Sequence, residues 1–268
     1  MYPLVSPVTA VVRNVPATFA KALQQNQVPL DVELAQAQHA AYVEGVKEFV
    51  RKVIVLSADV NHPDCCFIED TAVIVGGKAA ISLMGAPSRR GEEKLIRTTL
   101  REAGLRTVLL DFPATMDGGD VLFTGKHLIV GLSKRTNADA VKQLGAFITE
   151  FPIVTVKVEG SLHLKSVMSI FDPEILLFGE CKAGHDILAQ LRGQGVIDGH
   201  YHPVMIPDPV ASNVLYMGRN IFIQDGFPAS EAVFIQLAGQ RNKQIFKVPM
   251  SELIKADGAL TCCSLLFA

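Results

Sequence analysis

The residues of this chain that could carry out chemistry stand at the start of segments that recur along the sequence. Glu69 and Asp70 begin EDTAVIVGG, Asp117 begins DGGDVLFTG, His163 begins HLKSVMSIF and Cys262 begins CCSLLFA. A thiol, an imidazole and carboxylates are the groups that nucleophilic and acid–base catalysis uses. Because all of them head a segment, the fold is expected to bring them together.

A fifth segment, NVLYMGRNIFI, starts at Asn213 and fills the gap between His163 and Cys262. Neighbouring heads therefore lie 46 to 50 residues apart. A period near this length indicates a propeller or an array, in which each repeat is one supersecondary unit. If the units surround an axis, their heads converge on one central pocket.

Cys262 and His163 could form the minimal pair for nucleophilic catalysis, with the histidine as proton donor and acceptor. A strand cysteine is often just a buried side chain, but Cys262 stands at the polar head of its unit. If the segment is a strand, Cys263 points to the opposite face, so only one of the pair can be the nucleophile. Asp117 could orient the imidazole as the third member of a triad-like set.

Acidic residues near the predicted pocket are too many for one thiol to explain. They are Asp64, Glu69, Asp70, Asp117, Asp120 and Asp257. Clustered carboxylates are costly unless a cation is bound. The sequence has no metal-ligand spacing of cysteines, so an organic cation is expected, and a guanidinium forms fork-like bonds to carboxylates. Asp120 could instead stabilise the turn in DGGD.

Two further features each have a structural and a functional interpretation. The basic pairs Arg89-Arg90 and Lys134-Arg135 precede predicted helices. They are either solvated charges at helix starts or a clamp for a carboxylate at the far end of a substrate. The polar segment 20–30, with the isolated Leu23, is either an ordinary connection or a mobile lid over the pocket.

The elements that must position these residues follow one order: strand, turn, strand, helix, strand. In the second unit, TAVIVGG and KAAISLM read as a hairpin split by two glycines. EEKLIRTTLREAG follows as an amphipathic helix, and RTVLLDF as a strand. Later helices are expected over 136–147, 185–193 and 229–239. The first unit takes helix 31–50 and strand KVIVLSA from one end of the chain and TCCSLLF from the other, so the termini close one blade and no sheet edge is left free.

The composition limits the classes of protein to which the chain can belong. A hydrophobic content of 49% over 268 residues supports a substantial core, and the repeat favours a single catalytic domain over residues 1–268. The net charge of −2 gives no footprint for nucleic acid or an anionic membrane. No signal peptide or membrane-spanning run is seen. Five cysteines, two pairs of them adjacent, make a poor disulfide framework, which indicates a reducing cytoplasm.

Seven motifs resemble, in their order along the chain, those of the dimethylarginine dimethylaminohydrolase family. They are PDCCFIED, GAPSRR, DGGDVLFTG, GLSKRTN, LHLKS, MSELIKADG and LTCCS. The resemblance runs from about residue 8 to residue 267, whereas DGGD and LHLKS alone indicate only the wider guanidino-modifying (pentein) superfamily. It implies an α/β fold, a five-bladed propeller of pseudo-symmetric ββαβ units, in agreement with the repeat.

The resemblance also implies a role for each site residue. Cys262 would attack the guanidinium carbon, and His163, paired with Asp117, would protonate the departing amine and then activate water. Substrate-binding positions are Leu23, Asp64, Phe67, Glu69, Asp70, Arg89, Arg135, Ala256 and Asp257. Among these, Arg89 and Arg135 match the arginines that grip the amino-acid carboxylate, and Leu23 matches the lid leucine. Ala256 stands where the mammalian enzymes have valine, but that contact is through backbone.

The expected function is that of a cytoplasmic hydrolase that converts Nω-methylated arginines to citrulline and methylamine or dimethylamine. No cofactor and no catalytic metal are implied, although zinc could bind Cys262 and His163 as an inhibitor. A small-molecule substrate is expected, with no nucleic-acid or membrane partner, in a monomer or a homodimer. The alternatives are deimination of arginine or agmatine by the same superfamily chemistry, and a propeller that only binds a ligand. Arg89 and Arg135 favour a free amino acid over agmatine, which has no carboxylate.

Overall fold

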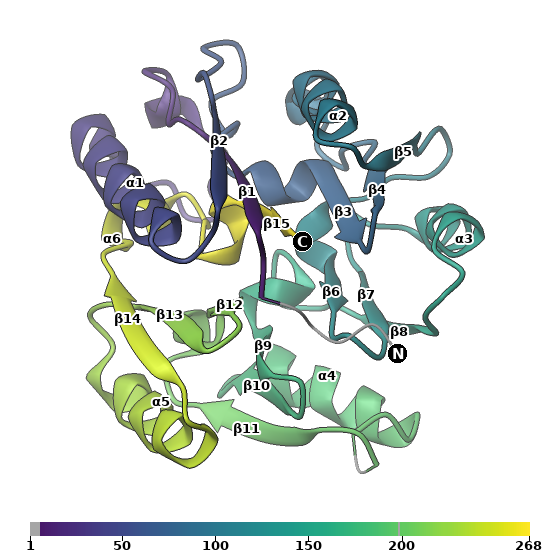
Figure 1. The fold of residues 1–268 in the computed structure, drawn as a ribbon, viewed down its shortest axis with the longest axis vertical. Coiled ribbons are helices and arrows are strands. Elements are labelled where there is room, and N and C mark those ends of the chain that lie inside the picture. Colours follow the sequence, from purple (N-terminus) through teal and green to yellow (C-terminus); the bar gives the residue numbers. More distant parts are fainter. Residues whose placement is uncertain (1–5, 198) are drawn as a thin grey trace.

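The computed structural model describes residues 6–197 and 199–268. These residues form five three-stranded sheets arranged around a central axis, with one long helix outside each sheet (Figure 1). The first sheet has the strands β15 (Leu265–Phe267), β1 (Thr9–Arg13) and β2 (Lys52–Leu56). The second has β3 (Ala72–Val75), β4 (Lys78–Ile81) and β5 (Arg106–Leu109). The expected five-bladed α/β propeller is confirmed.

The other three sheets repeat this arrangement. The third has β6 (Val121–Phe123), β7 (Leu128–Leu132) and β8 (Ile153–Lys157). The fourth has β9 (Met168–Asp172), β10 (Ile175–Gly179) and β11 (His202–Ile206). The fifth has β12 (Leu215–Met217), β13 (Asn220–Gln224) and β14 (Gln244–Val248). In every blade the inner strand pairs antiparallel with the middle strand, which pairs parallel with the outer strand.

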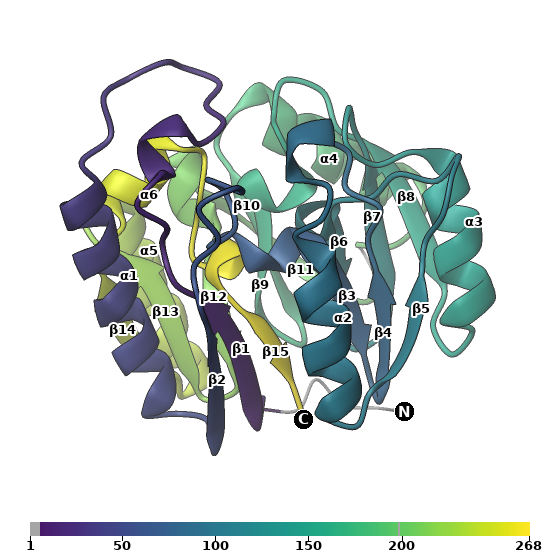
Figure 2. The same ribbon diagram turned by 90° about the horizontal axis from the view of Figure 1, so that it is seen from above.

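The termini meet in the first blade, as the sequence predicts. β15 is its inner strand and pairs with β1, whose Val11 lies opposite Leu265. This pairing completes the first blade and closes the ring of blades. Within the described residues, the inner strand of each sheet pairs only with the middle strand, so the expectation that no sheet edge is left free is wrong. The C-terminus and the start of β1 lie at the same end of the propeller, opposite the long loop that precedes the first helix (Figure 2).

Each helix packs between its own sheet and a neighbouring blade. The long helices are α1 (Val32–Lys47), α2 (Glu93–Glu102), α3 (Ala138–Phe147), α4 (Lys182–Gly193) and α5 (Pro228–Arg241). Five apolar clusters fill the spaces between blades; one of them joins Ile96 and Leu100 of α2 to Val11 of β1 and Ile81 of β4. None of the helices in residues 6–197 and 199–268 is long and apolar enough to cross a membrane.

Two local features differ from the sequence predictions. The polar head of each unit is not the first residue of a strand: a 3₁₀ turn of three or four residues precedes every inner strand. One short helix, α6 (Ser251–Lys255), was not predicted; it lies within MSELIKADG and packs against α1. The segment 22–30 has no regular structure beyond the 3₁₀ turn Phe19–Lys21.

The 3₁₀ turns explain how the heads converge. Their ranges are Ile68–Thr71, Gly118–Asp120, Leu164–Ser166, Pro209–Ser212 and Thr261–Cys263. The first contacts the second and the last, and the third contacts the second and the fourth. Because a 3₁₀ helix has three residues per turn, consecutive residues in these turns face different sides of the axis. A residue that could take part in chemistry and one with a structural role can therefore be neighbours in the same turn.

Candidate active site

A cavity of about 150 Å³ opens at the end of the propeller where the inner strands begin, beneath the long loop before α1 (Figure 2). Its lining residues are Leu23, Gln24, Gln25, Asp64, Phe67, Asp70, Arg89, Arg135, Leu162, His163, Ala256, Asp257 and Cys262. Two of the predicted catalytic residues and eight of the nine predicted substrate-binding residues thus line one small space. The exceptions are Asp117, which is fully buried behind His163, and Glu69.

Cys262 lies in the 3₁₀ turn Thr261–Cys263 rather than in a strand. The prediction that the two cysteines alternate between the faces of a strand is therefore wrong about the element that carries them. The two cysteines nevertheless face different ways. Cys262 is partly exposed and lines the cavity, whereas Cys263 is fully buried, with its thiol directed to the carbonyl of Ala259. Burial raises the pKa of the Cys262 thiol, and the carboxylates of Glu69 and Asp70 raise it further. These effects favour the neutral thiol over the thiolate at neutral pH.

His163 is held by the carboxylate of Asp117, with 3.0 Å between Nε2 and Oδ2. The other oxygen, Oδ1, accepts the backbone N–H of Gly85 at 2.8 Å. Burial lowers the pKa of His163, but Asp70 and Asp117 outweigh that effect and bring it to about 9. An imidazolium with this pKa can supply a proton near neutral pH, so the geometry is that of a general acid oriented by a buried carboxylate.

The turn that carries His163 is fixed by the DGGD segment. Asp120 is fully buried and accepts the backbone N–H of Leu164 and the hydroxyl of Ser133. A Cβ on Gly119 would lie 2.8 Å from Nδ1 of His163, so only glycine lets the backbone pass this close to the ring. Asp120 therefore has the structural role that the sequence left open.

The acidic residues divide between substrate-facing and structural positions. Asp64 and Asp70 line the cavity. Burial raises the pKa of Asp64, whereas the pKa of Asp70 lies below its ordinary value because His163 and Arg89 outweigh the effect of burial. Asp70 also accepts the backbone N–H of Gly119 at 2.9 Å. Two carboxylates on the wall beside a thiol favour a bound cation.

The two arginines that line the cavity are in different states. Arg89 is 4% exposed and its donors are engaged: Nη1 with Asp70 at 2.6 Å, and Nε and Nη2 with Glu92 at 2.9 and 2.8 Å. Arg135 is less buried, and within the described chain its guanidinium makes a single contact, Nη1 to Asp117 at 3.4 Å. Arg135 therefore has free donors for a substrate carboxylate, whereas Arg89 holds the acidic wall in place.

The loop before α1 is attached to the acidic residues of the cavity. The backbone N–H of Leu23 donates to Asp64 at 3.0 Å, and that of Gln25 donates to Asp257 at 2.6 Å. Asp257 has φ of 57°, a left-handed conformation that is uncommon outside glycine. Neither Gln24 nor Gln25 was predicted as a lining residue, and their types gave no signal for it. Only their place in segment 20–30 pointed to the site.

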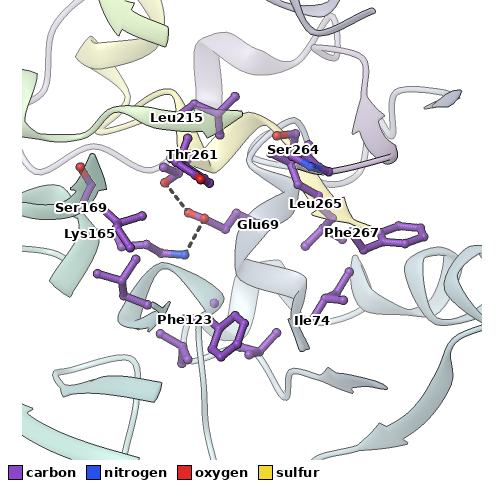
Figure 3. Close-up of a pocket in the computed structure, with 18 of the residues that line it drawn as sticks. Glu69, Ile74, Phe123, Lys165, Ser169, Leu215, Thr261, Ser264, Leu265 and Phe267 are labelled. Atoms are coloured by element: carbon purple, nitrogen blue, oxygen red, sulfur yellow. Dashed lines mark hydrogen bonds and ion pairs between the residues drawn. The ribbon is translucent and has the colours of Figure 1, made fainter. Parts of the chain in front are cut away.

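Glu69 does not line this cavity but a second, larger one of about 280 Å³ (Figure 3). Residues of all five inner strands line this second cavity, and so does the C-terminal residue Ala268. Glu69 accepts Nζ of Lys165 and the hydroxyl of Thr261, the latter at 2.7 Å. This ion pair, which the sequence analysis did not identify, lies between the two cavities. Lys165 was within reach of prediction only through its place in LHLKS.

One group of side chains in residues 6–197 and 199–268 has ligand atoms close enough to hold a metal ion. It consists of Asp70, Asp117 and His163, whose ligand atoms lie within 4.8 Å of one another. Asp70 already binds Arg89, and Asp117 binds His163 and Gly85. The arrangement is therefore explained by charge pairing around the imidazole, and Cys262 is not among its members.

Comparisons with known proteins show the family to which the chain is related. A family model described as N,N dimethylarginine dimethylhydrolase, eukaryotic, matches residues 11–178. A human protein named putative hydrolase DDAH2 is 30% identical over 97% of this chain and 94% of its own length. A protein of Pseudomonas aeruginosa named N(G),N(G)-dimethylarginine dimethylaminohydrolase is 28% identical over 88% of this chain and 90% of its own length.

Solved structures match the fold over almost the whole chain. A mutant of the Pseudomonas aeruginosa enzyme complexed with citrulline has a TM-score of 0.88 and 24% sequence identity, and covers 98% of this chain and 100% of that chain. The N-terminal domain of ArgZ, an arginine dihydrolase from cyanobacteria, has a TM-score of 0.80 and 16% identity, with 98% of each chain covered. Both likenesses concern the propeller itself.

Proposed function

The chain belongs to the dimethylarginine dimethylaminohydrolase family, and we propose that it hydrolyses Nω-methylated arginines to citrulline and dimethylamine or methylamine. The observation that carries this proposal is a single small cavity lined by Cys262, His163, three aspartates and an arginine with free donors. A cationic guanidinium fits between Asp64 and Asp70, and Arg135 suits the α-carboxylate at the other end of the same molecule.

The first half of the reaction forms a covalent intermediate. The bound cation lowers the pKa of Cys262, whose thiol proton passes to solvent, and Sγ forms a bond to the guanidinium carbon. The bond from that carbon to the methylated nitrogen breaks as His163 gives its proton to the nitrogen. A neutral amine departs, and a thiouronium cation remains on Cys262 next to a neutral imidazole.

The second half releases the product. Neutral His163 takes a proton from water, and the oxygen of that water bonds to the thiouronium carbon. The carbon–sulfur bond then breaks, the new hydroxyl loses its proton to form the urea carbonyl of citrulline, and the sulfur of Cys262 regains a proton. Asp117 keeps the imidazole in place and stabilises its charge in both halves.

Three features of the proposal concern the protein around the reaction. Segment 20–30 acts as a lid, because Leu23 and Gln25 dock on Asp64 and Asp257 at the rim of the cavity, and substrate must displace it to enter. Phe67, Ala256 and Asp257 form the remaining wall around the substrate. The protein works in the cytoplasm, since none of its cysteines is paired. It acts as a monomer or a homodimer.

One assay tests the proposal. The ureido product is measured from arginine, monomethylarginine, asymmetric and symmetric dimethylarginine, and agmatine, with Cys262→Ser as the background control. This product is citrulline from the first three, N-methylcitrulline from symmetric dimethylarginine, and N-carbamoylputrescine from agmatine, which has no carboxylate. Turnover confined to the monomethylated and asymmetrically dimethylated arginines is expected. Preferred turnover of arginine or agmatine would replace the proposal by deimination, and no turnover of any substrate by the intact protein would leave a binding propeller.

A further inference from the structure

Asn213 heads the fifth repeat unit, the one unit whose head has no part in the proposed reaction. Its side chain is almost fully buried, with 1% exposed. Oδ1 accepts the backbone N–H of Thr261 at 3.0 Å, while Nδ2 donates to Oγ1 of Thr261 at 3.0 Å and to the backbone carbonyl of Lys165 at 2.9 Å. Both hydrogens of the amide and one face of its oxygen are thus in use.

These contacts join the two turns that carry the reacting groups. Thr261 begins the turn that holds Cys262, and Lys165 lies in the turn that His163 caps. Glu69 closes the arrangement into a ring, because it binds the hydroxyl of Thr261 on one side and the ammonium of Lys165 on the other (Figure 3). Glu69, Lys165 and Thr261 of this ring line the second cavity, whereas Cys262, next to Thr261 in sequence, lines the active-site cavity.

We propose that Asn213 is a positioning residue that sets the spacing between the Cys262 turn and the His163 turn. The inference rests on the roles proposed above for Cys262 and His163. An amide suits this place because it must accept one hydrogen bond and donate two, which a carboxylate cannot do and a hydroxyl can do only in part. With the amide removed, a buried N–H and a buried carbonyl lose their partners, and the turns are free to shift.

The proposal separates the chemical step from substrate binding. A displacement of about 1 Å between reacting groups can cost about 10²-fold in rate, so kcat of Asn213→Ala is expected to fall by about that factor. Asp64 and Arg135 lie on other turns and do not touch Asn213. KM for a methylated arginine should therefore change only a few-fold. If Asn213 only supported the fold, its removal would reduce the amount of folded, active protein. The folded fraction would then not show this difference between the change in kcat and the change in KM.

The matched control is Ser212→Ala in the same turn. Ser212 is fully buried like its neighbour, but its hydroxyl donates to the carbonyl of Pro209 within the turn and does not reach the Cys262 or His163 turns. Both variants are compared for kcat, KM and thermal midpoint. The proposal expects loss of kcat in Asn213→Ala alone. Equal kcat in the two variants, at similar midpoints, would overturn it.

Thr261 provides a second test that does not depend on Asn213→Ala folding. Thr261→Val removes the hydroxyl between Asn213 and Glu69 but keeps the backbone N–H, and should lower kcat by about 10-fold. Thr261→Ser restores the hydroxyl and should return kcat to within a few-fold of the starting protein. The double variant Asn213→Ala/Thr261→Val is a separate measurement that uses the folded Asn213→Ala protein. Its loss should be less than the sum of the two single losses, because both changes remove the contact between Asn213 and the Thr261 hydroxyl. Additive losses, or no rescue by serine, would contradict the proposal.

A readout that needs no substrate keeps this inference separate from the proposed function. Iodoacetamide labelling is mapped to each cysteine by mass spectrometry, with the partly exposed Cys181 as internal reference. Asn213→Ala should raise labelling of Cys262 at least several-fold relative to Cys181, while Cys263 stays protected. Absence of citrulline release by the intact protein would refute the proposed function. The labelling of Cys262 relative to Cys181 would still test the role of Asn213. An unchanged ratio in the folded variant would overturn the inference.

Discussion

The Cys262 thiol is expected to stay protonated in the free protein and to ionise when a guanidinium binds beside it. The perturbation is a small cation, methylguanidinium, which carries the reacting group without the amino-acid arm. Burial raises the pKa of Cys262 above its ordinary value, and the charges of Glu69 and Asp70 raise it further. The thiolate should therefore appear only above about pH 8.5, the ordinary midpoint of a cysteine.

The expected size of the effect follows from the charges around the thiol. An opposite charge within about 4–6 Å lowers the pKa of an acid by about 1–3 units. Below the pKa, each unit changes the thiolate fraction about tenfold. The bound cation should thus increase the thiolate fraction of Cys262 by about 10-fold to 10³-fold at a fixed neutral pH.

Ultraviolet absorbance of the thiolate measures this fraction without requiring a reagent to enter the cavity. The protein is titrated with and without methylguanidinium, and the titration of Cys262→Ser is subtracted to remove the other four cysteines. A free-protein midpoint well below the ordinary cysteine value would refute the reasoning. It would mean that His163 owes its charge to a thiolate partner instead of to Asp70 and Asp117.

Three further predictions concern single side chains at the cavity. Cys262→Ser should abolish turnover, whereas Cys263→Ser should retain most of it because that thiol faces away from the cavity; citrulline release compares them, and activity in the first variant would exclude Cys262 as nucleophile. His163→Gly should lose at least about 10²-fold in kcat and recover part of it with added imidazole, while near-normal kinetics without imidazole would exclude the general-acid role. Arg135→Ala should lose about 2–5 kcal/mol of binding to a methylated arginine but little with a decarboxylated analogue, so equal losses on both substrates would make Arg135 structural.

The convergence of the unit heads could be predicted from spacing alone, because a repeat of constant length puts equivalent residues at equivalent places around an axis. The spacing could not predict which of the two cavities each head residue faces. Glu69 and Asp70 are adjacent in sequence, yet one lines the second cavity and the other the active-site cavity. The 3₁₀ turns decide this, and they are too short to leave a periodic signal in the sequence.

The two arginines illustrate a second limit of the sequence. GAPSRRG and LSKRTN offer similar basic side chains before a helix, and either could bind a substrate carboxylate. The difference arises from Glu92, three residues after Arg89, which occupies two donors of that guanidinium. Arg135 has no such partner at that spacing and reaches only Asp117, at 3.4 Å. Which arginine is free depends on tertiary pairing, so it could be known only from the structure.

Neighbouring polar residues in the 3₁₀ turns at the unit heads face different cavities, and the residues on each side have a physical role. Asp70 and Cys262 line the active-site cavity, while their neighbours Glu69 and Thr261 bind each other and line the second cavity. The ion pair with Lys165 stabilises the carboxylate of Glu69, and that same carboxylate raises the pKa of Cys262. In the proposed reaction, the ring that positions Cys262 therefore also disfavours its thiolate until a cation binds.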